Sequence, residues 1–169
     1  MTRKTLFLAA LVTVAASGIL PAQDTSTTDA DKGDPRVPAA LDRVGLHYTA
    51  TSNGNYSVTY DLDRGRSQVA YIVGKTETYD GVEIRELWSR AGTFDQAPSA
   101  EVMQKLLLDS GAEKIGSWGL EESSKGGYIL YFTIRVPVSI ADEALKSLVE
   151  LAADVADQKE DELFNVDEE

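Results

Sequence analysis

The pair of residues with the most chemical potential in this chain is two aspartates before a glycine. Asp61 and Asp63 are separated by one residue, and Gly65 follows in the same turn. Calcium prefers several oxygen ligands held by a tight turn, so this pattern could begin a cation site. A full calcium loop needs further carboxylates and a closing glutamate at set spacing, and Arg64 and Arg66 bring repelling positive charge instead. The same pattern is typical of a turn that aspartates stabilise.

Other residues that could catalyse a reaction are isolated in the sequence. His47 is the only histidine, whereas a metal site or a Ser-His-Asp arrangement needs several groups around one position. The sequence has no Gly-x-Ser-x-Gly motif and neither of the glycine-rich phosphate-binding patterns. We therefore predict no enzyme activity, cofactor or metal. An envelope enzyme that uses carboxylates such as Asp61, Asp63 or Glu86, with or without calcium, is the alternative.

Five residues are candidates for contact with a partner: Arg66, Ser67, Gln68, Trp88 and Trp118. The first three form a polar patch at the start of a predicted strand, and they could equally be a solvated turn that keeps a strand edge from aggregating. The two tryptophans are large enough to anchor a partner, although they could also pack in the core.

The two ends of the chain differ in composition from the middle. Arg3 and Lys4 precede an apolar run from Leu6 to Leu20, and Ala22 is a small residue at the expected cleavage point. These are the parts of a secretory signal peptide, so we expect residues 1–22 to direct export to the periplasm or the medium. Residues 23–35 lack bulky apolar side chains and are predicted to be a disordered linker. Residues 157–169 are predicted to be an acidic tail.

Charge and cysteine content exclude several functions. The formal net charge is −12, and it becomes −14 without residues 1–22, which contain two basic residues and no acidic one. Nucleic acid and anionic membranes bind clusters of Lys and Arg, so neither is an expected partner. The chain has no cysteine, which excludes disulfides, thiolate catalysis and thiolate metal ligands.

Residues 36–156 have the length of one domain, and their pattern predicts an α+β fold. Tyr56–Leu62 and Gln68–Val73 alternate apolar and polar residues around a glycine turn, which indicates an antiparallel ribbon. Further strands are predicted at residues 46–51, 82–89, 114–121 and 128–136. In the last of these, one face carries Tyr128, Leu130, Phe132, Ile134 and Val136, so we expect that face to be buried. The strand at 82–89 breaks the alternation, so we expect a bulge or burial on both faces there.

Three helices are predicted to pack on this antiparallel meander. The first begins near Pro38 and ends at Gly45, the second follows the N-cap Ser99 and ends before Gly111, and the third follows a capping box that begins at Ser139. The third helix carries a long apolar stripe, so it must pack against the sheet.

The ordered succession of these segments resembles the YbjN-like family of bacterial proteins. The segments that carry the resemblance are Tyr56–Leu62 with Gly65–Val69, Glu86–Ser89, Leu106–Ser110, Gly119–Leu120 and Val136–Val138. The resemblance implies the fold of type III secretion chaperones, a homodimer, and binding of extended segments of other proteins; it implies no catalytic residues. The leading hypothesis is therefore an exported, non-enzymatic, chaperone-like protein-binding module, with the envelope enzyme and a structural scaffold of the envelope as alternatives.

Overall fold

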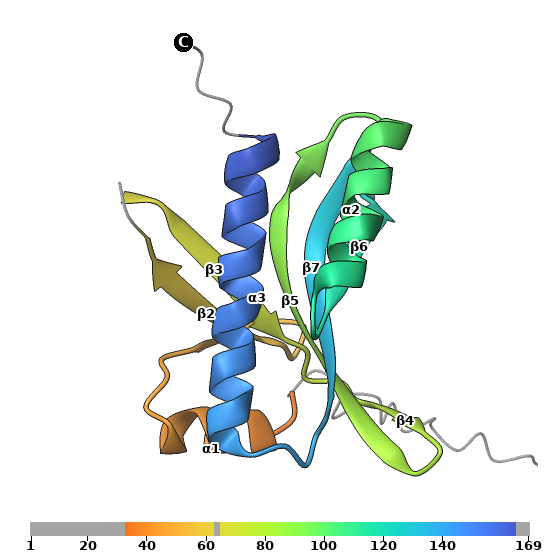
Figure 1. Cartoon of the computed structure of the whole chain (residues 1–169). Helices are drawn as coiled ribbons and strands as arrows, with labels where there is room; N and C mark the ends of the chain where they lie inside the picture. Colours follow the sequence, from red (N-terminus) through yellow and green to blue (C-terminus); the bar gives the residue numbers. More distant parts are fainter. Residues whose placement is uncertain (1–32, 63–64, 165–169) are drawn as a thin grey trace, which may run out of the picture.

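The computed structural model describes residues 33–62 and 65–164 of the 169-residue chain. These residues form three helices and seven strands (Figure 1). The elements in chain order are α1 (Arg36–Arg43), β1 (Thr49–Ala50), β2 (Tyr56–Asp61), β3 (Ser67–Ile72), β4 (Glu77–Tyr79), β5 (Val82–Phe94), α2 (Ala100–Ala112), β6 (Ser117–Glu122), β7 (Tyr128–Pro137) and α3 (Asp142–Leu163). The expected α+β arrangement is confirmed.

The strands build one antiparallel sheet in the order β1-β2-β3-β5-β7-β6, with β4 paired to β5 beside this path. The predicted ribbon is present as β2 and β3, whose register runs from Tyr56 opposite Ile72 to Asp61 opposite Ser67. The chain then places β7 between β5 and β6. Strands from distant parts of the sequence are therefore neighbours at the centre of the sheet.

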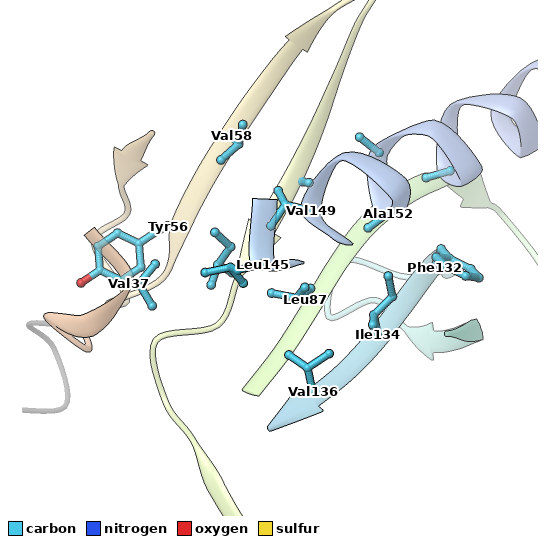
Figure 2. Close-up of a cluster of buried hydrophobic side chains, with 14 of the residues drawn as sticks. Val37, Tyr56, Val58, Leu87, Phe132, Ile134, Val136, Leu145, Val149 and Ala152 are labelled. Carbon is cyan, nitrogen blue, oxygen red and sulfur yellow. The ribbon is translucent and has the colours of Figure 1, made fainter. Parts of the chain in front are cut away.

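The core lies between α3 and one face of the sheet, as Figures 1 and 2 show. As the alternation of β7 predicted, Leu130, Phe132, Ile134 and Val136 all point into this core. Leu87, at the centre of β5, is fully buried among them. On α3 the buried side chains are Leu145, Val149, Ala152, Ala153, Ala156 and Lys159. The small alanines allow the helix axis to come close to the sheet.

Several elements differ from the sequence predictions. The first strand contains only Thr49–Ala50, and β4 was not predicted. The fifth strand continues to Phe94, and its register shift lies between Arg90 and Gly92, beyond the range 82–89 in which a bulge was expected. Within that range the burial alternates regularly, with Arg85, Leu87 and Ser89 on the buried face. The helix α2 does have Ser99 as its N-cap, whose side chain accepts a hydrogen bond from the Val102 amide. It does not end before Gly111, as predicted, but continues to Ala112.

The predicted capping box of the third helix is wrong. The helix begins at Asp142, its N-cap is Ala141, and no side chain caps it. The amide of Ile140 instead donates a hydrogen bond to the Pro137 carbonyl, so Ser139 lies in a turn between β7 and the helix. Asp142 and Glu143 in the first turn complement the helix dipole in place of a cap.

Both ends of the domain reach further than residues 36–156. Asp34, in the expected linker, forms an ion pair with Arg85, and α3 continues through the beginning of the expected acidic tail to Leu163. The predicted signal peptide, linker residues 23–32 and tail residues 165–169 lie outside the described residues. Within the described part of the chain, no helix is long and apolar enough to cross a membrane.

Candidate functional site

The sheet has one face toward the helices and one face that no described helix covers (Figure 1). On β3, Gln68, Ala70 and Ile72 are buried on the helix side, so Val69 and Tyr71 point the other way. The same alternation places Trp88 on the uncovered face of β5 and Tyr131 on that of β7. The central strands therefore present aromatic side chains away from the core.

Three aromatic rings gather on this uncovered face. Tyr71 and Trp88 are opposite each other on β3 and β5, and their rings stack with centroids 4.3 Å apart and an interplanar angle of 17°. Tyr131 meets Trp88 edge to face, with centroids 6.2 Å apart and an angle of 72°. All three residues are partly exposed, so they form a preorganised aromatic surface in contact with solvent.

A glycine on the neighbouring strand makes room for Tyr131. A Cβ atom on Gly119 would lie only 2.4 Å from Cζ of the Tyr131 ring. Gly119 and Tyr131 are opposite each other in the register of β6 and β7. The glycine therefore allows the tyrosine ring to lie over the strand, where it faces Trp88.

A hollow of about 570 Å³ lies beside these rings. Its lining comes mainly from β3, β5 and β7, with one residue each from β6 and α3: Ser67, Gln68, Val69, Tyr71, Glu86, Trp88, Arg90, Glu121, Ile129, Tyr131 and Glu160. This volume is typical of pockets that enclose a small molecule or several side chains of a peptide.

The hollow lies where the sheet divides. In the described chain β3 and β5 share three register pairs, from Ala70 with Ser89 to Ile72 with Leu87, although both strands continue beyond Ala70 and Ser89. Figure 1 shows the two strands diverging there. Gln68 bridges the opening, because its Nε2 donates to Ser89 Oγ at 2.9 Å and to the Arg90 carbonyl at 2.7 Å.

Carboxylates give the hollow a negative environment. Glu86, Glu121 and Glu160 line it together with one cation, Arg90. Oε1 of Glu86 accepts hydrogen bonds from Thr133 Oγ1 at 2.6 Å and from Arg135 at 3.2 Å.

The environment of the hollow also affects the pKa of the Tyr131 hydroxyl. Burial raises the pKa of Tyr131, and the nearby carboxylates of Glu121 and Glu86 raise it further, against the opposing effect of Arg135. Burial favours the neutral form of this hydroxyl, whereas the two carboxylates favour positive charge near it.

Of the five predicted contact residues, the structure brings three to this hollow: Ser67, Gln68 and Trp88. Only Ser67 is freely exposed, since Gln68 is 5% exposed and held by its hydrogen bonds. Arg66 turns toward α3 instead, where it donates to Asp157 at 2.7 Å and also pairs with Asp161.

Trp118 lies on the other face of the sheet. Its ring meets Phe132 edge to face at 5.2 Å, and Lys159 Nζ lies 5.7 Å from its centroid. It lines a separate apolar groove of about 190 Å³ between α2 and β6, with Met103, Leu106, Leu107, Ser110, Gly119, Leu120 and Leu130. The two tryptophans therefore belong to different surfaces.

The residues considered for metal or carboxylate chemistry are dispersed. His47 is exposed before β1, Asp61 is exposed at the end of β2, and Asp63 and Arg64 lie outside the described residues. Glu86 lines the hollow, whereas Asp61 does not. Across residues 33–62 and 65–164, no three His, Asp or Glu side chains gather in a way that could hold a metal ion.

Sequence reasoning missed Tyr71, Tyr131, Glu121 and Glu160 as members of this site. Alternation did place Tyr131 opposite the buried face of its strand, because Leu130 and Phe132 were predicted to be buried. The missing information was the strand order, since β3, β5 and β7 are neighbours without being consecutive in the chain.

Comparisons with known proteins give a distant likeness. No protein-family model and no curated protein matches the chain. Among solved structures, the chain is similar to the crystal structure of YbjN from E. coli, with a TM-score of 0.45 and 10% sequence identity over 73% of this chain and 84% of that chain. The likeness concerns the fold, so function has to be inferred from the side chains of this chain.

Proposed function

We propose that this chain is a non-enzymatic, chaperone-like binding module that holds an extended polypeptide segment against the uncovered face of its sheet. One observation carries the proposal: Tyr71, Trp88 and Tyr131 lie together around a hollow where the sheet divides. Aromatic anchors that are rigid before binding lose little conformational entropy when they contact a partner.

The divided sheet favours an extended partner over a compact one. Beyond their three register pairs β3 and β5 no longer pair with each other, so part of their backbone faces the opening. Side chains bind two carbonyls there, because Gln68 donates to that of Arg90 and Ser89 donates to that of Val69. The backbone of an extended segment can form hydrogen bonds with such backbone groups, and every second side chain of the segment can then enter the hollow. Specificity would then come from the aromatic and charged lining.

We also propose that the chain acts outside the cytoplasm, in the periplasm or the medium. The support is the basic start, apolar run and small residue within residues 1–22. Mass spectrometry of the protein from its native envelope tests this point, since an N-terminus at Gln23 is expected and an intact Met1 end would contradict it.

A homodimer is the third part of the proposal. The exposed apolar side chains Leu107 and Leu108 of α2 are 74% and 68% exposed, and Leu120 of the edge strand β6 lines the groove beside Leu107. On an acidic protein such an apolar surface is unusual unless it is covered in use. We infer that a second copy covers it, because the surface can pair with itself across a twofold axis.

The binding surface can be tested by site-specific crosslinking. A photoreactive amino acid replaces Val69, inside the hollow, or Asp42, which is exposed on α1 away from the hollow. The full chain is then irradiated in its native cells, and the captured polypeptide is identified and synthesised. Capture at Val69 with direct binding of the synthetic segment is expected. Equal capture at Asp42, or no binding by the segment, would contradict the proposal.

A further inference from the structure

We propose that the hollow receives the cationic side chain of a lysine or arginine from the bound polypeptide. This inference rests on the proposed function and names the chemistry of the partner. It also gives a role to the three glutamates that line the hollow beside the aromatic rings.

The rings supply the first part of a cation site. Trp88 and Tyr131 meet at 72°, so their rings form two walls of a corner, and Tyr71 supports the tryptophan by stacking on it. The faces of tryptophan and tyrosine attract cations through the ring quadrupole, most strongly where water is partly excluded. The stacked pair also fixes the orientation of Trp88 before a ligand arrives.

The carboxylates supply the second part. Glu121 from β6 and Glu160 from α3 border the hollow in addition to Glu86 of β5. Arg135 pairs with Glu86, and Arg90 is the cation within the lining, so the acidic groups outnumber the basic ones. Burial is the main cause of the raised pKa of Tyr131, and the carboxylates of Glu121 and Glu86 raise it further.

An amino acid side chain is favoured over a free organic cation by the shape of the site. The hollow of about 570 Å³ extends along the opening between β3 and β5, where Ser67, Gln68 and the strand backbones offer polar contacts. A polypeptide can use these contacts along its main chain while its ammonium or guanidinium group reaches the rings. A small quaternary ammonium ion could contact the rings but not the polar groups along the opening.

The test uses the full chain with Trp118→Phe, so that Trp88 is its only tryptophan. Three short synthetic peptides are compared, each with valine at every second position. The positions between the valines are lysine in the first peptide, glutamine in the second and glutamate in the third. Quenching of Trp88 fluorescence measures their affinities. We expect the lysine peptide to bind about tenfold more tightly than the glutamine peptide, and tetramethylammonium to bind much more weakly than either.

Two adjacent glutamates provide a matched control. Glu121 lines the hollow, whereas Glu122, the next residue of β6, points to the other face of the sheet. Glu121→Gln should weaken binding of the lysine peptide about threefold, and Glu122→Gln, which makes the same change in net charge, should leave it unchanged. Added salt should reduce the preference for lysine.

The outcomes separate this inference from the proposed function. Equal binding of the three peptides, or equal effects of Glu121→Gln and Glu122→Gln, would overturn the cation site and leave peptide binding in place. Tetramethylammonium binding as tightly as the lysine peptide would overturn the choice of a polypeptide side chain. Failure of every peptide to bind would overturn the proposed function together with the inference.

Discussion

Gln68 shows how one polar side chain can replace part of a sheet. Its amide donates to Ser89 Oγ and to the Arg90 carbonyl where β3 and β5 have separated, and Ser89 Oγ donates in turn to the Val69 carbonyl at 2.8 Å. A chain of side-chain hydrogen bonds thus joins the two strands at the edge of the hollow. The sequence position of Gln68, beside Ser67, indicated an exposed side chain, but β3 places this side chain on its buried face.

Removal of this bridge should destabilise the fold. Gln68→Ala leaves the Arg90 carbonyl without this donor, so we expect the free energy of unfolding to fall by about 1–3 kcal/mol. Urea unfolding followed by circular dichroism measures it. Ser67→Ala is the matched control on an exposed neighbour, and it should change the free energy by less than about 0.5 kcal/mol. Equal effects of the two variants would show that Gln68 is not a structural bridge.

Asp34 anchors the start of the domain through a buried ion pair. The Arg85 side chain is 4% exposed and that of Asp34 is 9% exposed. Arg85 also donates to the Val73 carbonyl at 2.7 Å, and Arg36 links Asp34 to Glu83. Burial alone would raise the pKa of Asp34, but hydrogen bonds from Arg36 and Arg85 outweigh it and hold that pKa well below its usual value.

This cluster predicts a pH dependence of stability. Hydrogen bonds from Arg36 and Thr76 lower the pKa of Glu83 from 4.5 to about 2, and the pKa of Asp34 is lowered from 3.8. Both groups release protons more readily when folded. Their stabilisation is therefore complete above their unfolded pKa values and is lost as the pH falls through the folded ones.

The measurement compares Asp34→Asn with the parent protein over a range of pH. At pH 7 the variant should be less stable by about 3 kcal/mol, because Arg85 is left buried without its anionic partner. This difference should shrink as the pH falls below 3.8, the ordinary pKa of Asp34, because Asp34 of the parent protein then becomes protonated more readily in the unfolded state. Thermal melting can record this change. Asp42→Asn, a change of the same kind on the exposed side of α1, is the control. A difference that does not vary with pH would contradict the assignment.

At the scale of elements, the last turns of α3 connect distant parts of the fold. Lys159 is 8% exposed and donates to Asp109 of α2 and to Glu162, both at 2.5 Å. Phe164 packs against Phe94 of β5 with ring centroids 4.9 Å apart. The acidic composition of residues 157–169 indicated a solvated tail. The structure instead gives Lys159 and Phe164 contacts with Asp109 of α2 and Phe94 of β5.

A truncation distinguishes a structural helix end from a tail. A chain that ends at Ala156 loses the contacts of Lys159 with Asp109 and of Phe164 with Phe94. We expect its free energy of unfolding to be lower by about 2–4 kcal/mol, with altered fluorescence from Trp118, which Lys159 approaches. The matched control ends at Phe164 and should retain the parent stability. Equal stability of both truncated chains would show that the folded domain ends at residue 156, as the sequence predicted.

The sequence was informative about elements wherever burial alternates along one strand or helix. It predicted β2, β3, β7 and the Ser99 cap because these signals are local. It did not predict β4, whose three residues are all exposed, or the aromatic group, since the contact of Trp88 with Tyr71 and Tyr131 depends on strand order and register. Local patterns carry no information about pairing between distant strands.

At the scale of the whole molecule, the two candidate surfaces differ in chemistry. The hollow combines aromatic rings with charged groups, whereas the groove at α2 is lined almost entirely by apolar side chains. The first surface suits an extended, basic polypeptide, and the second suits a copy of the same apolar surface. Because they lie on opposite faces of the sheet, a dimer through α2 would leave both hollows accessible.

This arrangement makes the oligomeric state separable from peptide binding. Leu107→Glu combined with Leu108→Glu places charge on the proposed dimer surface, so the dimer dissociation constant should rise at least about 30-fold, as for loss of a central interface contact. Both side chains are exposed, hence the fold should persist. Light scattering over a concentration series measures the mass. Val82→Glu, at an exposed apolar residue of β5 near the β4 turn, is the control and should remain dimeric. A parent chain that is monomeric at every concentration would contradict the dimer, and loss of peptide binding in the double variant would show that the two surfaces depend on each other.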